Sequence, residues 1–293
     1  MTSAVTAVGL TKRYGRRAAL IDCTLELPAG HVVGLVGPNG AGKTTLLQLA
    51  CGLLAPTAGT LEVLGRRPVA GSPQVGFVAQ DTALYPALTV AEHLRLGARL
   101  NPGWDAALAR QRAGRLDLDP SQRAGRLSSG QRAQLALVLA IAKRPDLLLL
   151  DEPAAALDPL ARREFLQTLM EFVAENGTSV VLSSHLLADL ERVCDHLVVL
   201  VGSRVRVAGE VDELLATHHR LTGARRDPAD LGGGRRIVHA SHTDVQSTLI
   251  VRSSAPIDDP SWSTTQVDVE DLVLAYMAEA VHTARRRVLA EHR

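Results

Sequence analysis

A glycine-rich run that ends in lysine and threonine is the first feature of this sequence that could do chemistry. Residues 37–44 read Gly-Pro-Asn-Gly-Ala-Gly-Lys-Thr and follow a short apolar run at 32–36. Glycines permit a tight turn whose backbone N–H groups face a phosphate, and a helix starting at Gly42 or Lys43 adds positive potential. Lys43 can contact the outer phosphates, and the Thr44 hydroxyl can ligate Mg²⁺. The pattern predicts a site for a nucleoside triphosphate with Mg²⁺, without identifying the reaction.

Two adjacent acids end a second apolar run. Residues 147–150 are all leucine, and Asp151 and Glu152 follow them. A buried strand would carry Asp151 to the phosphate loop, where its carboxylate could hold Mg²⁺ through water. Glu152 could polarise the water that attacks a γ-phosphate. The alternative is that both acids only cap the turn before Pro153, but the phosphate loop upstream favours the chemical interpretation.

The composition limits the class of protein. Of the 293 residues, 46% are apolar and only 3% aromatic, and the formal net charge is +1. This length predicts one or two domains, and the neutral balance argues against nucleic-acid binding by bulk charge. No apolar stretch approaches the roughly 18 residues that span a bilayer, and no signal peptide is expected. The three cysteines form no metal or redox pair, so a reduced cytosolic protein is the expectation.

The elements that must position these residues alternate between strand and helix, which predicts an α/β fold with a largely parallel core sheet. We expect strands over 5–10, 24–27, 32–36, 60–63, 75–79, 147–150, 179–183, 197–201 and 203–208, and helices over 43–52, 130–143, 159–176 and 186–194. The stretch from 84 to 145 is helical, with a capping box at Thr89 and Glu92. Residues 218–236 predict a linker. Beyond it, strands over 237–241, 247–252 and 266–269 and a helix over 270–280 predict a small α/β region at 237–293.

Residues 127–131, Leu-Ser-Ser-Gly-Gln, resemble the signature motif of ATP-binding-cassette (ABC) ATPases, which other P-loop families lack. The resemblance covers about residues 4–215. It implies a P-loop NTPase cassette with a mixed core sheet, an antiparallel β subdomain and a helical subdomain at about 84–145. The implied nucleotide-binding domain is 1–217, followed by the linker and a C-terminal α/β extension.

Further residues match this family one by one. Tyr14 resembles the aromatic residue that stacks on adenine, and Gln80 the glutamine that senses Mg²⁺, the attacking water and the transport partner. Asp158 resembles the loop acid that crosses a dimer, and His185 the switch histidine that contacts the γ-phosphate. Each match has a simpler alternative: a surface tyrosine for Tyr14, a polar residue at a strand end for Gln80, only a helix N-cap for Asp158 and an ordinary surface histidine for His185. Asp158 is expected to cap its helix as well.

The implied site residues fall into three groups. The catalytic group is Glu152, His185 and Gln80, and the metal group is Thr44, Gln80 and Asp151. The nucleotide-binding group is Tyr14, Gly37, Pro38, Asn39, Gly40, Ala41, Gly42, Lys43, Thr44, Thr45, Ser128, Gly130, Gln131 and Asp158. The sequence departs from the family at Ser129, where glycine is commonest, and at Ala155 and Ala156, where small polar residues or glycine are common. The two alanines could weaken communication between sites.

The resemblance also implies ligands and partners. ATP and Mg²⁺ would bind, and a second copy or a paralogous ATPase would complete a head-to-tail dimer around two ATP molecules. A separate membrane permease would hold the chain at the inner face of the cell membrane, and no nucleic acid is expected. The C-terminal extension and residues 269–277 resemble ATPases of bacterial ABC-2-type exporters, including drug-resistance members. The alternatives are a soluble ABC ATPase acting on ribosomes or DNA, and a regulatory cassette that hydrolyses ATP poorly.

Overall fold

A six-stranded sheet lies at the centre of the chain, in the order β5-β6-β7-β3-β8-β9. The computed structural model describes residues 3–226, 235–257 and 259–291, with side chains as far as residue 280. The strands are β3 (Val32–Val36), β5 (Val75–Val78), β6 (Leu147–Asp151), β7 (Ser179–Ser183), β8 (His196–Val201) and β9 (Arg204–Glu210). All neighbours pair in parallel except the antiparallel β8–β9 hairpin. The predicted, largely parallel core sheet is confirmed.

Alternate residues of the core strands pack into two different hydrophobic cores. In β6, Leu147 and Leu149 face the core that contains α1 (Lys43–Ala50), whereas Leu148 and Leu150 face the core that contains α5 (Pro159–Asn176). Every residue of β3, β6 and β7 is buried. Because both faces of the sheet are covered, these strands are continuous apolar runs in the sequence rather than alternating ones.

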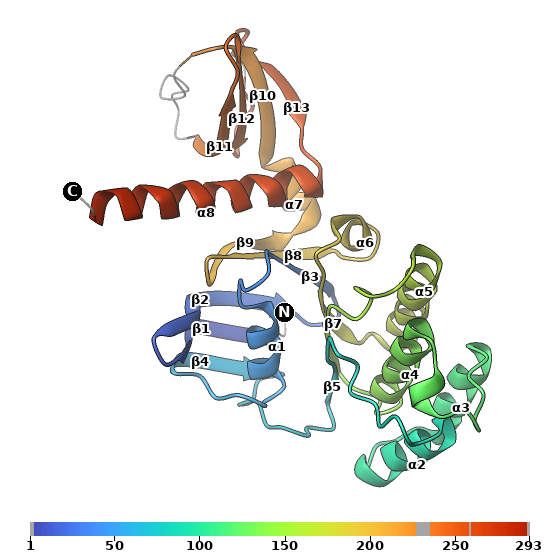
Figure 1. Cartoon of the computed structure of the whole chain (residues 1–293). Coiled ribbons are helices and arrows are strands. Elements are labelled where there is room, and N and C mark those ends of the chain that lie inside the picture. The colour runs from blue at the N-terminus through green and yellow to red at the C-terminus, as the bar shows by residue number, and fades with distance from the viewer. Residues whose placement is uncertain (1–2, 227–234, 258, 292–293) are drawn as a thin grey trace.

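Two smaller parts lie on opposite sides of the molecule (Figure 1). One is an antiparallel sheet in the order β2-β1-β4, formed by β1 (Ser3–Tyr14), β2 (Arg17–Pro28) and β4 (Ala58–Val63). The other is helical and contains α2 (Val90–Leu100), α3 (Ala106–Arg115), the 3₁₀ turn η1 (Ala124–Arg126) and α4 (Ser129–Ile141). The predicted fold class, with its antiparallel and helical parts, is confirmed.

Side-chain caps define where the helices begin. Thr89 and Glu92 form the predicted capping box of α2, and Ser128 forms a second one with Gln131 at α4. Asp158 accepts hydrogen bonds from two N–H groups in the first turn of α5. The helix expected over 186–194 is shorter, α6 (Leu187–Glu191), and α7 (Val211–Ala216) follows β9. None of the described helices combines the length and apolar character that crossing a membrane requires.

The C-terminal region corrects two sequence predictions. Its antiparallel sheet has the order β11-β12-β10-β13, formed by β10 (His218–Ala224), β11 (Arg236–His242), β12 (Gln246–Arg252) and β13 (Ser263–Gln266). Residues 218–224, predicted as linker, are therefore an inner strand, and the strand predicted at 266–269 lies at 263–266. Only His218 and Leu221 of β10 are buried, and all of β13 is exposed, so neither strand shows apolar alternation. Residues 227–234 of the predicted linker lie outside the described residues.

The last helix, α8 (Val269–Glu291), joins this sheet to the rest of the chain (Figure 1). Leu272, Val273 and Tyr276 are fully buried in the same core as Val199 of the central sheet. The Tyr276 hydroxyl and Nε2 of the buried His218 form a 3.0 Å hydrogen bond. The apolar spacing of three and four residues is that of a helix with one buried face. The C-terminal region therefore shares a core with the part of the chain that contains the central sheet.

Candidate functional site

The loop between β3 and α1 has a backbone that only glycine fits at two positions. Gly37 and Gly42 have φ angles of 155° and 110°. A Cβ on Gly37 would lie 2.0 Å from the Leu200 carbonyl oxygen, and one on Gly42 would lie 2.4 Å from that of Ala19. No side chain caps α1 at Gly42, so its first-turn N–H groups face the loop without a side-chain acceptor. This geometry suits an anion at the start of α1.

Lys43, Glu152 and His185 form a continuous chain of contacts beside this loop. Lys43 is 5% exposed and donates to the Gly37 carbonyl at 2.7 Å. Its Nζ lies 3.2 Å from Oε1 of Glu152, and Oε2 of Glu152 lies 2.9 Å from Nδ1 of His185. Because a carboxylate only accepts, the Nδ1 of His185 carries the proton in this contact. The structure thus brings these three predicted site residues together.

Glu152 is an ionised carboxylate in a strained backbone position. Burial raises its pKa, but hydrogen bonds from Lys43 and His185 and their positive charge outweigh burial and hold the pKa below its ordinary value. The residue has a φ of 45°, in the left-handed region, and it precedes Pro153, which disfavours the α-helical region. Such strain costs on the order of 1–3 kcal/mol and persists only where surrounding contacts hold it. Here it aims the side chain at Lys43 and His185.

Ser183 connects the two acids, and sequence reasoning did not identify it as a site residue. Its buried hydroxyl donates to Oδ1 of Asp151 at 2.9 Å and accepts from the Glu152 N–H at 2.8 Å. Asp151 is 1% exposed. The two residues meet because β6 and β7 pair with Asp151 opposite Ser183. The available signal was that two apolar strands end in polar residues, since carboxyl ends of parallel strands share one edge of a sheet.

A polar cavity of about 480 Å³ opens above the loop. It is lined by Tyr14, Arg17, Ala19, Gln80, Glu152 and the loop residues Asn39, Gly40, Ala41, Gly42, Lys43, Thr44 and Thr45. Tyr14 is 48% exposed and lies under Nζ of Lys12, 5.4 Å from the ring centroid. Arg17 is a lining residue that the sequence did not single out. It reaches the cavity because it pairs with Tyr14 across the β1–β2 hairpin.

The remaining predicted residues lie elsewhere. Ser128, Gly130 and Gln131 line a different cavity, of about 490 Å³, between α3, α4 and α5. Asp158 caps α5, as predicted, with its Oδ1 accepting from Leu160 and Ala161 at 3.0 Å each. Within one chain, the signature residues and Asp158 do not line the cavity above the phosphate loop.

The residues beside this cavity fit a magnesium nucleotide. The glycine loop, the uncapped start of α1 and the buried Lys43 suit a polyphosphate, and the exposed Tyr14 ring suits a base. The Thr44 hydroxyl in the cavity lining is an oxygen ligand of the kind that Mg²⁺ prefers, and so is the carboxylate of the buried Asp151, which directly precedes the lining residue Glu152.

Replacing Ser183 with alanine is expected to slow hydrolysis of the predicted nucleoside triphosphate about tenfold, because the Asp151 carboxylate and the Glu152 N–H would each lose a buried partner. Nucleotide affinity should change less than kcat, since Lys43 and the loop remain. Phosphate-release kinetics on Ser183→Ala and Ser183→Thr check this. Threonine keeps the hydroxyl, so rescue by threonine is expected. Equal activity of wild type and Ser183→Ala would contradict this positioning role.

Comparisons with known proteins agree with this geometry. A family model described as ABC transporter matches residues 20–155. The chain is 35% identical over 211 residues to the uncharacterized ABC transporter ATP-binding protein YxlF of Bacillus subtilis, covering 70% of each protein. It is 34% identical over 269 residues to the daunorubicin resistance ATP-binding protein DrrA3 of Streptomyces coeruleorubidus, covering 88% of this chain and 84% of the relative. It is also 36% identical to the sulfate/thiosulfate import ATP-binding protein CysA 1 of Agrobacterium fabrum, covering 71% of this chain and 64% of that protein.

Solved structures show the same cassette. An ATP-binding subunit of an ABC transporter matches with a TM-score of 0.64 and 32% identity, covering 72% of this chain and 92% of that one. The dimeric structure of MJ0796, a bacterial ABC transporter cassette, matches with a TM-score of 0.63 and 25% identity, covering 70% and 98%. The chain is a P-loop ATPase, and it belongs to the ATP-binding subunits of ABC transporters. A non-transport role on ribosomes or DNA is not favoured.

Proposed function

We propose that this ATPase drives export through a separate permease of the ABC-2 type. The proposal rests on the share of this chain that aligns with a drug-resistance relative and with an importer relative. The alignment with the daunorubicin resistance protein covers 88% of this chain, whereas the alignment with the sulfate importer covers 71%. An alignment that covers 88% of this chain must extend through β10, β11 and β12 of the C-terminal sheet, and Val238 and Ile250 of that sheet share a core with the nucleotide-binding part. The same proposal places the chain in the cytoplasm, at the inner face of the membrane.

The contacts around Glu152 support a division of roles in hydrolysis. Lys43 and the loop N–H groups would bind the β- and γ-phosphates, with Tyr14 beside the base. Thr44 and Asp151, with Gln80 nearby, would hold Mg²⁺, which neutralises charge on the phosphates when bound. Glu152 would orient and deprotonate the attacking water, because its pKa is held low and it is a carboxylate at neutral pH. His185 would hold Glu152 in place through Nδ1 and present Nε2 toward the γ-phosphate.

A head-to-tail dimer would explain why the signature residues lie apart from the phosphate loop. Ser128 and Gly130 sit at the start of α4, where N–H groups and the helix dipole favour an anion. We propose that they contact the γ-phosphate of ATP held by a second copy, as supported by the solved dimer of a similar cassette. Asp158, at the start of α5, would also face the second copy.

Replacing Ser128 with alanine is expected to lower kcat about tenfold, because the γ-phosphate would lose one charge-assisted hydrogen bond. ATP affinity of the monomer should change less than about twofold, because the phosphate contacted belongs to the partner copy. Affinity is measured by titration at dilute protein and kcat at high protein concentration.

The matched control is Thr89→Ala, which removes the equivalent capping box from α2 and should leave both values unchanged. Loss of monomer ATP binding in Ser128→Ala would contradict the dimer arrangement.

The export proposal is tested first by whether a gene beside this one encodes a six-span membrane protein, as the proposal expects, and then with that protein. The two are co-expressed, purified through a tag on the membrane protein, and placed in inside-out vesicles. Export predicts co-purification and ATP-dependent accumulation of substrate inside these vesicles. Dependence on an external substrate-binding protein, with ATP-driven loss from the vesicles, would indicate import instead.

A further inference from the structure

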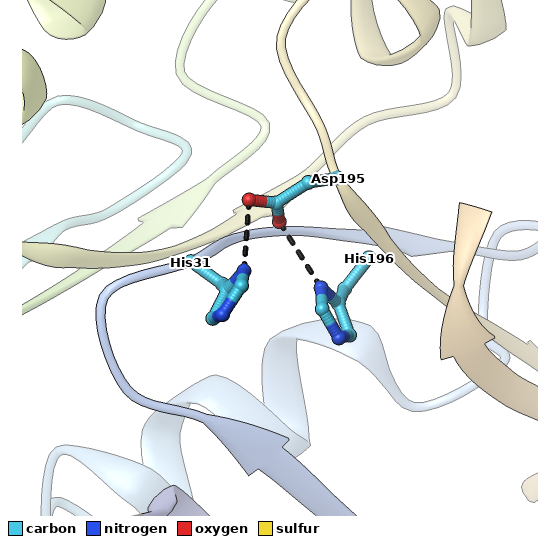
Figure 2. Close-up of side chains that lie close together, drawn as sticks. All are labelled: His31, Asp195 and His196. Carbon is cyan, nitrogen blue, oxygen red and sulfur yellow. Dashed lines mark hydrogen bonds and ion pairs between the residues drawn. The ribbon is translucent and has the colours of Figure 1, made fainter. Parts of the chain in front are cut away.

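Three metal-ligating side chains lie together outside the nucleotide site (Figure 2). His31 precedes β3, Asp195 precedes β8, and His196 is the first residue of β8. Nδ1 of His31 lies 2.9 Å from Oδ2 of Asp195, and Nδ1 of His196 lies 3.1 Å from Oδ1. The two imidazole rings meet edge to face with centroids 4.6 Å apart. One ligand atom from each residue lies within 4.8 Å of the other two.

The core sheet holds the backbones of these residues in place. β3 and β8 pair in parallel, with Val33 opposite His196. The Val32 N–H donates to Oδ1 of Asp195 at 3.0 Å, and the Val32 carbonyl accepts from the Asp195 N–H at 3.1 Å. The His31 carbonyl accepts from a β7 N–H at 2.9 Å. Because their backbones are fixed, the three side chains converge without ordering a loop, as a prearranged metal site requires.

The donor set defines the kind of ligand. Two imidazoles with one carboxylate suit Zn²⁺ and related first-row cations, whereas Mg²⁺ prefers oxygen ligands alone. Tetrahedral Zn²⁺ with bonds near 2.05 Å places its ligand atoms about 3.4 Å apart. The two nitrogen–oxygen distances, 2.9 and 3.1 Å, are already shorter than this separation. The ligand atoms of the three residues, one from each, all lie within 4.8 Å of one another. The side chains of His31, Asp195 and His196 are 38%, 49% and 18% exposed. Small rotations of these side chains can therefore bring the ligand atoms to the separation that Zn²⁺ requires.

We propose that His31, Asp195 and His196 form a binding site for Zn²⁺, with water as the remaining ligand. The Val32 N–H would orient the carboxylate from behind, as outer hydrogen bonds do in metal sites. The site lies at the amino ends of β3 and β8, whereas the phosphate loop follows the carboxyl end of β3. At about 3.3 Å per residue, the five residues of β3 separate the two by roughly 16 Å. The ion would therefore share no ligand with the nucleotide site. It would link the turn before β3 to the start of β8 through their side chains.

The test uses the untagged full chain, stripped with EDTA and free of nucleotide. Calorimetric titration with ZnCl₂ is expected to show one ion per chain, and MgCl₂ should not compete. Zn²⁺ should also raise Tm by about 5 °C at a free concentration near 100 times Kd. The double variant His31→Gln/His196→Gln should bind Zn²⁺ at least about tenfold more weakly, and Asp195→Asn should also weaken it, because it keeps the shape but loses the charge.

Two control variants test whether Zn²⁺ binding is specific to His31, Asp195 and His196. His219→Gln changes a partly buried histidine in β10 and should bind Zn²⁺ as the wild type does. Glu152→Gln should also bind normally, because Glu152 belongs to the nucleotide site. Melting of each variant without metal verifies folding. Absence of saturable binding, one ion per two chains, or binding that survives the double histidine variant but is lost in Glu152→Gln would each overturn the proposal.

Discussion

Replacing Glu152 with glutamine is expected to reduce ATP hydrolysis by about 10²–10⁴-fold, the usual contribution of a positioned general base. Glutamine is similar in size but has no negative charge, so it cannot accept a proton from water. It also removes the 3.2 Å ion pair with Lys43. ATP should still bind, and the variant should accumulate as an ATP-bound dimer because hydrolysis no longer opens it. Phosphate release and size-exclusion chromatography with Mg-ATP measure the two effects.

The control for this variant is Glu62→Gln, which changes an exposed glutamate in β4 and should leave both readouts unchanged. A Glu152→Gln chain that stays monomeric with ATP would contradict the proposed role. A wild-type chain without measurable hydrolysis, unaffected by the substitution, would instead support the regulatory cassette.

Replacing Lys43 with alanine is expected to weaken ATP binding by about 10–100-fold, as expected for a charge-assisted contact to phosphate. Lys43 is buried, and its Nζ is held at the loop by the Gly37 carbonyl at 2.7 Å. The substitution removes this cation and leaves the Glu152 carboxylate with His185 as its remaining described ion-pair partner. Calorimetric titration with Mg-ATP measures the affinity.

Arg66→Ala serves as the control, because it removes one exposed positive charge outside the cavity above the loop. Melting curves of both variants verify that each is folded. Unchanged affinity in Lys43→Ala would be evidence against the phosphate-binding role of the loop.

Local patterns explain why so much of the fold could be predicted. β3 and β7 have the predicted bounds because a strand buried on both faces is a continuous apolar run. The starts of α2 and α5 were predictable from Thr89 and Asp158, since a cap and its N–H donors lie within one turn. The glycine loop was likewise visible, because a tight phosphate-binding turn requires specific residue types at fixed spacing.

Contacts between distant segments could not be predicted in the same way. β10 was predicted as linker because its buried residues, His218 and Leu221, are covered by partners far along the chain, Tyr276 among them. The Ser183 bridge between the two acids depends on the register of β6 against β7. Likewise, His31 meets Asp195 only because β3 pairs with β8.

By itself, the sequence determined the class of chemistry, since the phosphate loop, the acid pair at 151–152 and the signature at 127–131 are each contained in a short segment. The tertiary structure alone decided how these segments meet. It placed Glu152 between Lys43 and His185 at a φ of 45°, left the signature residues apart from the loop, and packed α8 onto the central sheet. The physical reason is that strand register, strained backbone angles and shared cores arise from contacts between residues far apart in the chain, which no local pattern encodes.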